Sequence, residues 1–376
     1  MKKRILTGDR PTGRLHLGHY VGSLRSRVEL QDKYECFFII ADLHTLTTKP
    51  EKTGELKELI NNLVLDYLSV GIDPKRATIY IQSQIPEVAE LAVIFQNLVT
   101  VPRLERLPTL KDVMRDSNIK IPSFGLLGYP VLQSADILMV KADLVPVGKD
   151  QESHIELTRE IAREFNRLYR RGPVSRFPPA SARSGQKSNV KLKDQAELRA
   201  VGNLSTTATP TGDVFSVPEA LIPRGIGTLP GTDGKAKMSK SAGNVINLTD
   251  SAGEVAKKVM GMYTDPNRVH GDEPGNVEGN PVFVYLDSFK ESESQRVKVE
   301  EYKEKYKKGT LKDVEVKQLL VEVLEVFLEP IRRRRAQFEK QPELVDRILK
   351  EGTKKAREEA KKTLAEVKRA MKLDYY

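Results

Sequence analysis

The chain has 376 residues, more than one compact domain usually holds, so two domains are expected. Its formal net charge of +10 favours a polyanionic partner, with a generically basic protein as the alternative. It contains no apolar run of roughly eighteen residues and no apolar stretch after its basic first residues, which predicts neither a membrane span nor a signal peptide. The single cysteine, Cys36, lies in an apolar run and allows no intrachain disulfide or cysteine metal cluster, which fits a reducing cytoplasm.

The most informative segment is residues 5–20, ILTGDRPTGRLHLGHY. Its first apolar residues predict a buried strand, glycines and a proline at residues 8–13 break regular structure, and a helical pattern begins near Gly18. A strand, a glycine-rich turn and a helix start present backbone N–H groups and a positive helix terminus to a phosphate. This segment is therefore a candidate phosphate-binding site.

Two histidines, His16 and His19, flank Gly18 at that helix start. Imidazoles there can donate hydrogen bonds to phosphate oxygens, and the glycine leaves room for a flat base. Alone, however, this H-x-G-H pattern is equally compatible with a surface loop. A P-loop is rejected, because Arg14 and Leu15 stand where the phosphate-binding lysine and the Mg²⁺-binding hydroxyl are required.

Further along, apolar runs at residues 36–42 and 78–82 predict parallel strands, with a helix from about Glu51 to Val70 between them. This alternation predicts an α/β fold with a Rossmann-like doubly wound parallel sheet. Residues 86–115 show a helical pattern cut by Pro102 and Pro108. This segment either forms a partner surface or caps the sheet.

Residues 129–139 predict a helix on which Leu132, Asp136 and Met139 share one face. A carboxylate on an apolar face needs a hydrogen-bond donor, which comes either from the protein or from a ligand. Residues 144–151 then predict a short strand ending in a turn, followed by a long helix. Gly148 to Gln151 thus lie at the carboxyl edge of a strand, where open α/β sheets bind ligands.

The composition changes between residues 170 and about 214, where Ser, Thr, Gly, Pro and charged residues predict an extended or disordered surface insertion. Ordered structure is expected to begin again at Phe215. The glycine-flanked segment 235–241 carries three lysines and two serines and could clamp an anion, although such loops are usually only solvated.

Residues 249–376 are predicted to be almost wholly helical. The four arginines at 332–335 and the Lys/Arg-rich segment 349–372 are either solvated helix faces or contacts to a nucleic-acid backbone. A nucleotide site upstream favours backbone contacts for some of them.

His16-Leu17-Gly18-His19 and Lys237-Met238-Ser239-Lys240-Ser241 together resemble the two signature motifs of class I aminoacyl-tRNA synthetases. Either motif alone is a weak signal, and the ordered pair is a strong one. Residues 7–13 look like the N-terminus of the tryptophan and tyrosine members. Residues 129–138 and 145–159 are similar to the bacterial tryptophanyl-tRNA synthetases. The resemblance covers nearly the whole chain except residues 170–214.

The resemblance implies activation of L-tryptophan with ATP and Mg²⁺ to the adenylate, followed by transfer to the 3′ end of tRNA(Trp). It further implies a cytoplasmic homodimer, to which the helices at residues 86–115 could supply the interface. Residues 1–248 would form the catalytic domain, with a helical connecting segment at about 84–128 and the insertion at about 170–214. Residues 249–376 would form a helical tRNA-binding domain.

The resemblance also implies roles for individual residues. Those that stabilise the departing pyrophosphate would be His16, His19, Lys237 and Lys240. The ATP site would comprise Arg10, Pro11, Thr12, Gly18, His19, Gly148, Lys149, Asp150, Leu229, Lys237, Met238, Ser239, Lys240 and Ser241. For tryptophan, Asp136 would accept the indole N–H, and the remaining contacts would come from Tyr129, Gln133, Gln151 and Leu6.

Three positions depart from the family pattern. Gln133 stands where many bacterial tryptophan enzymes have methionine, Arg10 replaces a common glutamine, and Lys149 replaces an acidic residue beside ATP. The alternatives are a tyrosine–tRNA ligase, a cofactor adenylyltransferase with an H-x-G-H site, and a non-catalytic RNA-binding relative. The adenylyltransferase would not explain the late lysine loop, and intact signature residues argue against a non-catalytic relative.

Overall fold

The computed structural model describes residues 2–51, 53–148, 151–169, 212–222, 229–234, 237–240, 242–264, 268 and 273–375. Most of the insertion expected at 170–214 lies outside the described residues. So do three expected members of the ATP site, Lys149, Asp150 and Ser241.

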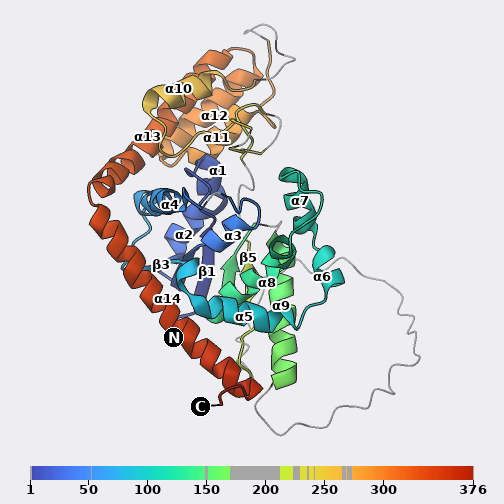
Figure 1. Cartoon of the computed structure of the whole chain (residues 1–376). Helices are drawn as coiled ribbons and strands as arrows, with labels where there is room; N and C mark the ends of the chain where they lie inside the picture. The colour runs from blue at the N-terminus through green and yellow to red at the C-terminus, as the bar shows by residue number, and fades with distance from the viewer. Residues whose placement is uncertain are drawn as a thin grey trace, which may run out of the picture.

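A parallel five-stranded sheet with the order β3-β2-β1-β4-β5 forms the centre of the molecule (Figure 1). Its strands are β1 (Arg4–Asp9), β2 (Glu35–Ile40), β3 (Ala77–Ile81), β4 (Leu144–Pro146) and β5 (Glu219–Leu221). This confirms the predicted Rossmann-like α/β class. The strand order reverses at β1, whose neighbours are β2 and β4, and open α/β sheets bind ligands outside the carboxyl ends of the strands at such a point.

Helices cover both faces of the sheet, and two hydrophobic cores result. Successive residues of a strand point to opposite faces, so Ile5 and Phe38 belong to one core while Leu6 and Phe37 belong to the other. The helices up to residue 169 are α1 (Leu17–His19), α2 (Arg25–Leu30), α3 (Asp42–Leu46), α4 (Leu56–Val70), α5 (Pro86–Gln96), α6 (Val101–Glu105), α7 (Pro108–Asp116), α8 (Phe124–Met139) and α9 (Glu152–Tyr169). A π-helical turn, Tyr20–Leu24, joins α1 to α2.

Two helix starts differ from the sequence prediction. Helix α4 begins at Leu56 rather than near Glu51, since Gly54 just before it disfavours helical backbone. Helix α8 begins before Tyr129, at Phe124, because the Ser123 side chain accepts the Leu126 N–H and caps it.

The region after residue 249 is helical, as predicted, with α10 (Ala252–Met260), α11 (Pro281–Phe289), α12 (Glu293–Lys307), α13 (Asp313–Glu339) and α14 (Pro342–Met371). Helices α10 to α13 gather at one end of the molecule, whereas α14 returns along the sheet (Figure 1). No helix in the described part of the chain is long and apolar enough to span a bilayer.

Helix α14 covers the edge strand β3 at close range. A Cβ added to Gly352 would come within 1.9 Å of the Ile79 carbonyl oxygen, so only glycine fits at this contact. One residue further, the Thr353 hydroxyl accepts the Ile81 N–H at 3.2 Å. An uncovered edge strand presents unpaired backbone groups to other chains, and α14 removes that hazard here.

Candidate active site

A cavity of about 610 Å³ lies at the carboxyl ends of the strands. It brings together residues from β1, the α1–α2 segment, α8, the turn after β4 and the late lysine loop. The expected site residues that line it are Leu6, Arg10, Gly18, His19, Tyr129, Gln133, Asp136, Gly148, Gln151 and Lys237. Seven other expected members lie outside this lining: Pro11, Thr12, His16, Leu229, Met238, Ser239 and Lys240.

The two histidines of the first motif form a compact pair at the start of α1. The His16 backbone N–H donates to His19 Nδ1 at 3.2 Å, and the ring centroids are 3.7 Å apart. A Cβ on Gly18 would lie 3.0 Å from the His16 ring and 3.2 Å from the Met238 sulfur, so glycine allows this packing.

Burial keeps both imidazoles neutral at pH 7. The pKa of His16 is lowered to about 3, mainly by desolvation and in part by the neighbouring His19 and Lys240. Desolvation likewise lowers the pKa of His19 to about 4, against the opposing attraction of Asp9. These side chains therefore offer ring N–H donors rather than permanent positive charges.

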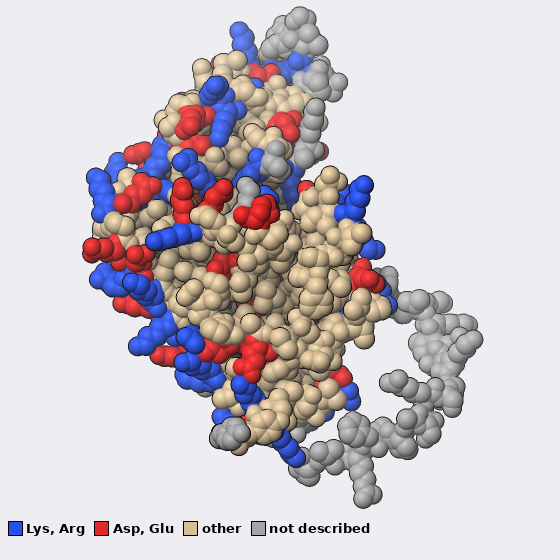
Figure 2. Space-filling view, viewed as in Figure 1, with Lys and Arg blue, Asp and Glu red and all other residues tan. Residues whose placement is uncertain are grey.

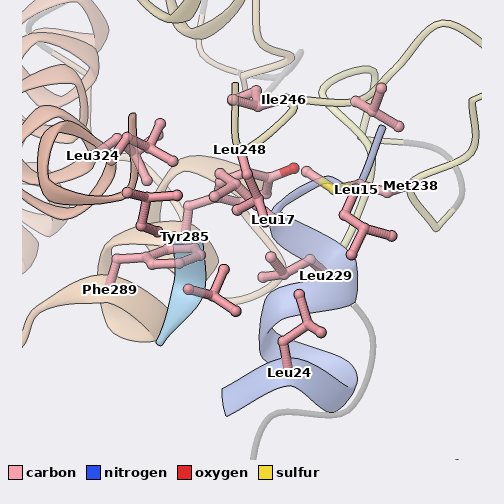
Figure 3. Packing of buried hydrophobic residues seen from close by; sticks show 14 of the residues in the cluster. Leu15, Leu17, Leu24, Leu229, Met238, Ile246, Leu248, Tyr285, Phe289 and Leu324 are labelled. Atoms are coloured by element: carbon pink, nitrogen blue, oxygen red, sulfur yellow. The ribbon is translucent and has the colours of Figure 1, made fainter. Parts of the chain in front are cut away.

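The late lysine loop packs directly on the first motif. Lys240 Nζ donates to the Gly13 carbonyl at 3.0 Å, and the Gly18 N–H points to the Met238 sulfur at 3.2 Å. The following segment continues this contact, because the Leu17 N–H donates to Ile246 at 2.9 Å. Figure 3 shows the shared apolar packing, in which Leu229 and Met238 lie beside the residues of the first motif. Two segments more than 200 residues apart thus form one wall.

Helix α13 also holds the first motif through a buried ion pair. Asp66 on α4 accepts the Leu15 N–H at 2.9 Å and pairs with Arg335 on α13. Asp66 is fully buried and Arg335 is 7% exposed. The backbone just before His16 is therefore anchored to the C-terminal helical region.

The arginine run at 332–335 is mostly engaged within the chain. Besides Arg335, Arg332 pairs with Glu325, and Arg334 Nε donates to the Ser69 carbonyl at 2.6 Å. Arg333 alone of the four has a largely exposed side chain, at 73%. Contacts to a nucleic-acid backbone thus remain an expectation for Arg333 but not for the whole run.

Asp136 lines the cavity and is 2% exposed. Gln82 Nε2 donates to both of its oxygens, at 3.0 and 2.8 Å, and His44 Nε2 lies 3.0 Å from Oδ2. Burial raises the pKa of Asp136, and the hydrogen bonds from His44 and Gln82 oppose that rise. The donors that this carboxylate requires therefore include two protein side chains.

Neither His44 nor Gln82 was predicted from the sequence. His44 lies on the short helix after β2, and Gln82 directly follows β3. Both positions are at the carboxyl edge of a parallel sheet, which was an available signal. A third missed residue is His154, 1% exposed, whose Nε2 lies 3.1 Å from the Tyr129 hydroxyl and also contacts Thr109.

A cavity at the switch point of a parallel sheet, walled by an H-x-G-H helix start and a lysine loop from far along the chain, defines a class I nucleotide-binding site. Comparison with known families agrees with this class. The family described as tRNA synthetases class I (W and Y) matches residues 1–329, and the chain belongs to this family.

Individual relatives span almost the whole chain. It is 52% identical over 372 residues to the tryptophan–tRNA ligase of Treponema pallidum, covering 98% of this chain and 97% of that one. It is 45% identical over 378 residues to the corresponding ligase of Chlamydia caviae, with 99% and 96% covered. Among solved structures it resembles the tryptophanyl-tRNA synthetase of Campylobacter jejuni complexed with ADP and tryptophan, with a TM-score of 0.77, 28% identity, and 98% and 99% covered.

Proposed function

We propose that the protein is a tryptophan–tRNA ligase, which activates L-tryptophan with ATP and transfers it to the 3′ end of tRNA(Trp). The observation that carries this proposal is the buried Asp136, held by two protein donors, in a cavity that both signature segments adjoin. The similarity to tryptophan–tRNA ligases over nearly the full chain supports it. Because translation consumes aminoacylated tRNA, we also propose that the enzyme works in the cytoplasm.

The proposed chemistry needs no catalytic base, since the tryptophan carboxylate is itself the nucleophile that attacks the α-phosphate. The protein has to align the reactants and stabilise the departing pyrophosphate. His19 and Lys237 line the cavity and supply an N–H donor and a positive charge. Lys240 Nζ donates to the Gly13 carbonyl beside them. Once that hydrogen bond breaks, this amine would also contact the departing pyrophosphate.

Asp136 is the proposed acceptor for the indole N–H. An ionised carboxylate has about four lone-pair sites, so it can accept a further bond beside those from His44 and Gln82. Phenylalanine fills a similar volume but has no N–H to donate. Phenylalanine would leave one acceptor position of the buried carboxylate without a donor, and an unmet buried acceptor disfavours such an analogue.

Mg²⁺ is proposed to enter with the nucleotide. It keeps most of its water and is usually held by one or two carboxylates together with substrate phosphates. Among the described residues no group of three His, Cys, Asp or Glu side chains could hold a metal ion. The triphosphate would therefore supply the main ligands, and Mg·ATP would be the substrate.

The proposed tRNA surface includes a basic groove of about 550 Å³ between α14 and the end of β3. Lys350, Lys354 and Lys361 line it and make no ion pair with any described residue. Their spacing places them on one face of α14. Figure 2 shows lysine and arginine side chains, mixed with acidic ones, along the edge of the molecule where α14 runs. Unpaired lysines on one helix face suit a phosphate backbone.

A homodimer is proposed through the helices that connect the two halves of the sheet. Large apolar side chains are exposed there, with Val93 at 59%, Val101 at 51%, Ile121 at 85% and Phe124 at 73%. Much of the surface over α8 is uncharged (Figure 2), whereas α7 beside it carries exposed charged side chains. Exposed apolar patches of this kind mark association surfaces. Sedimentation of the wild type at micromolar concentration should give twice the chain mass. A double variant with Val93→Lys and Phe124→Lys should give the mass of a single chain. A monomeric wild type would refute the dimer.

Amino-acid-dependent exchange between pyrophosphate and ATP tests the proposed function. Each of the twenty amino acids is assayed separately with purified enzyme and Mg²⁺, and tryptophan alone is expected to support rapid exchange. Exchange with tyrosine but not tryptophan would reassign the substrate within the same family. Exchange with neither would remove the proposed activity.

A further inference from the structure

A second carboxylate, Asp9, borders the cavity at the end of β1 with its side chain 21% exposed, and it lies outside both signature motifs. Its Oδ2 accepts Arg27 Nη1 at 2.6 Å and the Tyr67 hydroxyl at 2.7 Å, and Oδ1 lies 3.3 Å from Arg27 Nη2. Arg27 Nη2 also donates to the Gly8 carbonyl at 3.2 Å. The pair thus ties the end of β1 to α2 and α4.

Arg27 is deeply enclosed at this position. It is 2% exposed, and its guanidinium carbon lies 5.5 Å from the centre of the Tyr67 ring and 6.0 Å from that of Phe38. Its buried Nε–H has no hydrogen-bond partner among the described residues. Burial would lower the pKa of Arg27, but Asp9 outweighs it and raises that pKa. Burial would raise the pKa of Asp9, but Arg27 outweighs it and lowers that pKa. Both groups therefore remain ionised.

The location of Asp9 makes its charge matter for ATP. Asp9 and Asp136 are the acidic residues among the described lining of the cavity, and Asp136 already accepts hydrogen bonds from His44 and Gln82. Asp9 directly precedes Arg10 and interacts electrostatically with His19. An unneutralised carboxylate there would repel a triphosphate, and the partial burial of Asp9 strengthens such a repulsion.

We propose that Arg27 is a positioning residue of the ATP site, which neutralises Asp9 and holds it against Tyr67 so that Arg10, His19 and Lys237 present a net positive wall to the triphosphate. The inference rests on the proposed ATP-dependent activity and adds a determinant of nucleotide affinity to it. A pair that served only to brace β1 against α2 would affect ATP and tryptophan alike. An electrostatic role instead predicts that loss of Arg27 raises the KM for ATP, whereas loss of Asp9 lowers it or leaves it unchanged.

The test compares Arg27→Met, Asp9→Asn and the double variant in tryptophan-dependent pyrophosphate exchange. Arg27→Met leaves Asp9 unneutralised, and we expect the KM for ATP to rise by about tenfold or more, with the KM for tryptophan within about twofold of wild type. Asp9→Asn removes the anion, so its KM for ATP should be equal to or below the wild-type value. The KM for ATP of the double variant should return to within about threefold of wild type, because neither charge is then left without its partner.

Conservative and remote variants complete the design. Arg27→Lys keeps the charge and should recover most of the ATP affinity that Arg27→Met loses. Arg76→Met removes an exposed ion pair with Asp32 at the amino ends of the strands, away from the cavity. This variant should leave both KM values unchanged. Thermal unfolding of each variant confirms folding, and Arg27→Lys with Asp9→Asn still tests the inference should Arg27→Met unfold.

The same assays separate a wrong role for Arg27 from a wrong function for the protein. A wild type without tryptophan-dependent exchange would refute the proposed function, and the inference with it. With wild-type exchange intact, equal rises in the KM for ATP in Asp9→Asn and Arg27→Met would refute the inference alone. A double variant whose KM for ATP is as high as that of Arg27→Met would also refute the inference alone.

Discussion

Replacing Asp136 by alanine is expected to raise the KM for tryptophan by about 100-fold while changing the KM for ATP by less than about threefold. The substitution removes the proposed indole acceptor. It also leaves the donors of His44 and Gln82 buried without their partner. Pyrophosphate exchange at varied tryptophan and at varied ATP measures the two constants separately.

Asp136→Asn is the matched control, because it keeps the shape and one acceptor oxygen but loses the charge. Its KM for tryptophan should lie between those of wild type and Asp136→Ala. Discrimination against phenylalanine should weaken in both variants, since the hydrogen bond that favours tryptophan over phenylalanine is then weakened or lost. Equal rises in the two KM values would show that Asp136 supports the fold of the cavity rather than binding the indole.

Lys240→Ala is expected to slow adenylate formation by about 100-fold or more, with little change in tryptophan affinity. The reason is that its positive charge would act on pyrophosphate as it departs, and not on bound tryptophan. Lys240 Nζ donates to the Gly13 carbonyl, and burial is the main cause that lowers the pKa of this lysine. Single-turnover adenylate formation measures this rate.

Tryptophan affinity can be followed directly, because the chain contains no tryptophan and the added ligand fluoresces against tyrosine alone. Lys57→Ala on the exposed face of α4 serves as the control for loss of one lysine and should retain the wild-type rate. Unchanged adenylate formation in Lys240→Ala would remove that lysine from the proposed mechanism.

The sequence was informative where a signal is local. Short apolar runs predicted β1, β2 and β3, and Gly71 ended α4 as expected, with the positive φ that favours glycine. The ordered pair of motifs also predicted that His19 and Lys237 would share a site, and both line the cavity. These features depend on short patterns or on a known family arrangement.

The remaining features depend on contacts between distant segments. Gln82 meets Asp136 from 54 residues away, and Arg335 meets Asp66 from 269 residues away. Nothing local distinguishes Arg335, which is buried, from Arg333, which is exposed. Only the packing of α13 against α4 decides which arginine is enclosed, and a sequence pattern does not show that packing.

The contact between α14 and β3 has a consequence for synthesis on the ribosome. Ile81 and Thr353 are 272 residues apart, and chains grow at roughly 5–20 residues per second. The outer edge of β3 therefore stays exposed for roughly fifteen to fifty seconds, until α14 has been synthesised and can pack against it. During that interval a nascent chain exposes a strand that neighbouring nascent chains could pair with, so chaperones that shield emerging polypeptides should improve the yield of active enzyme.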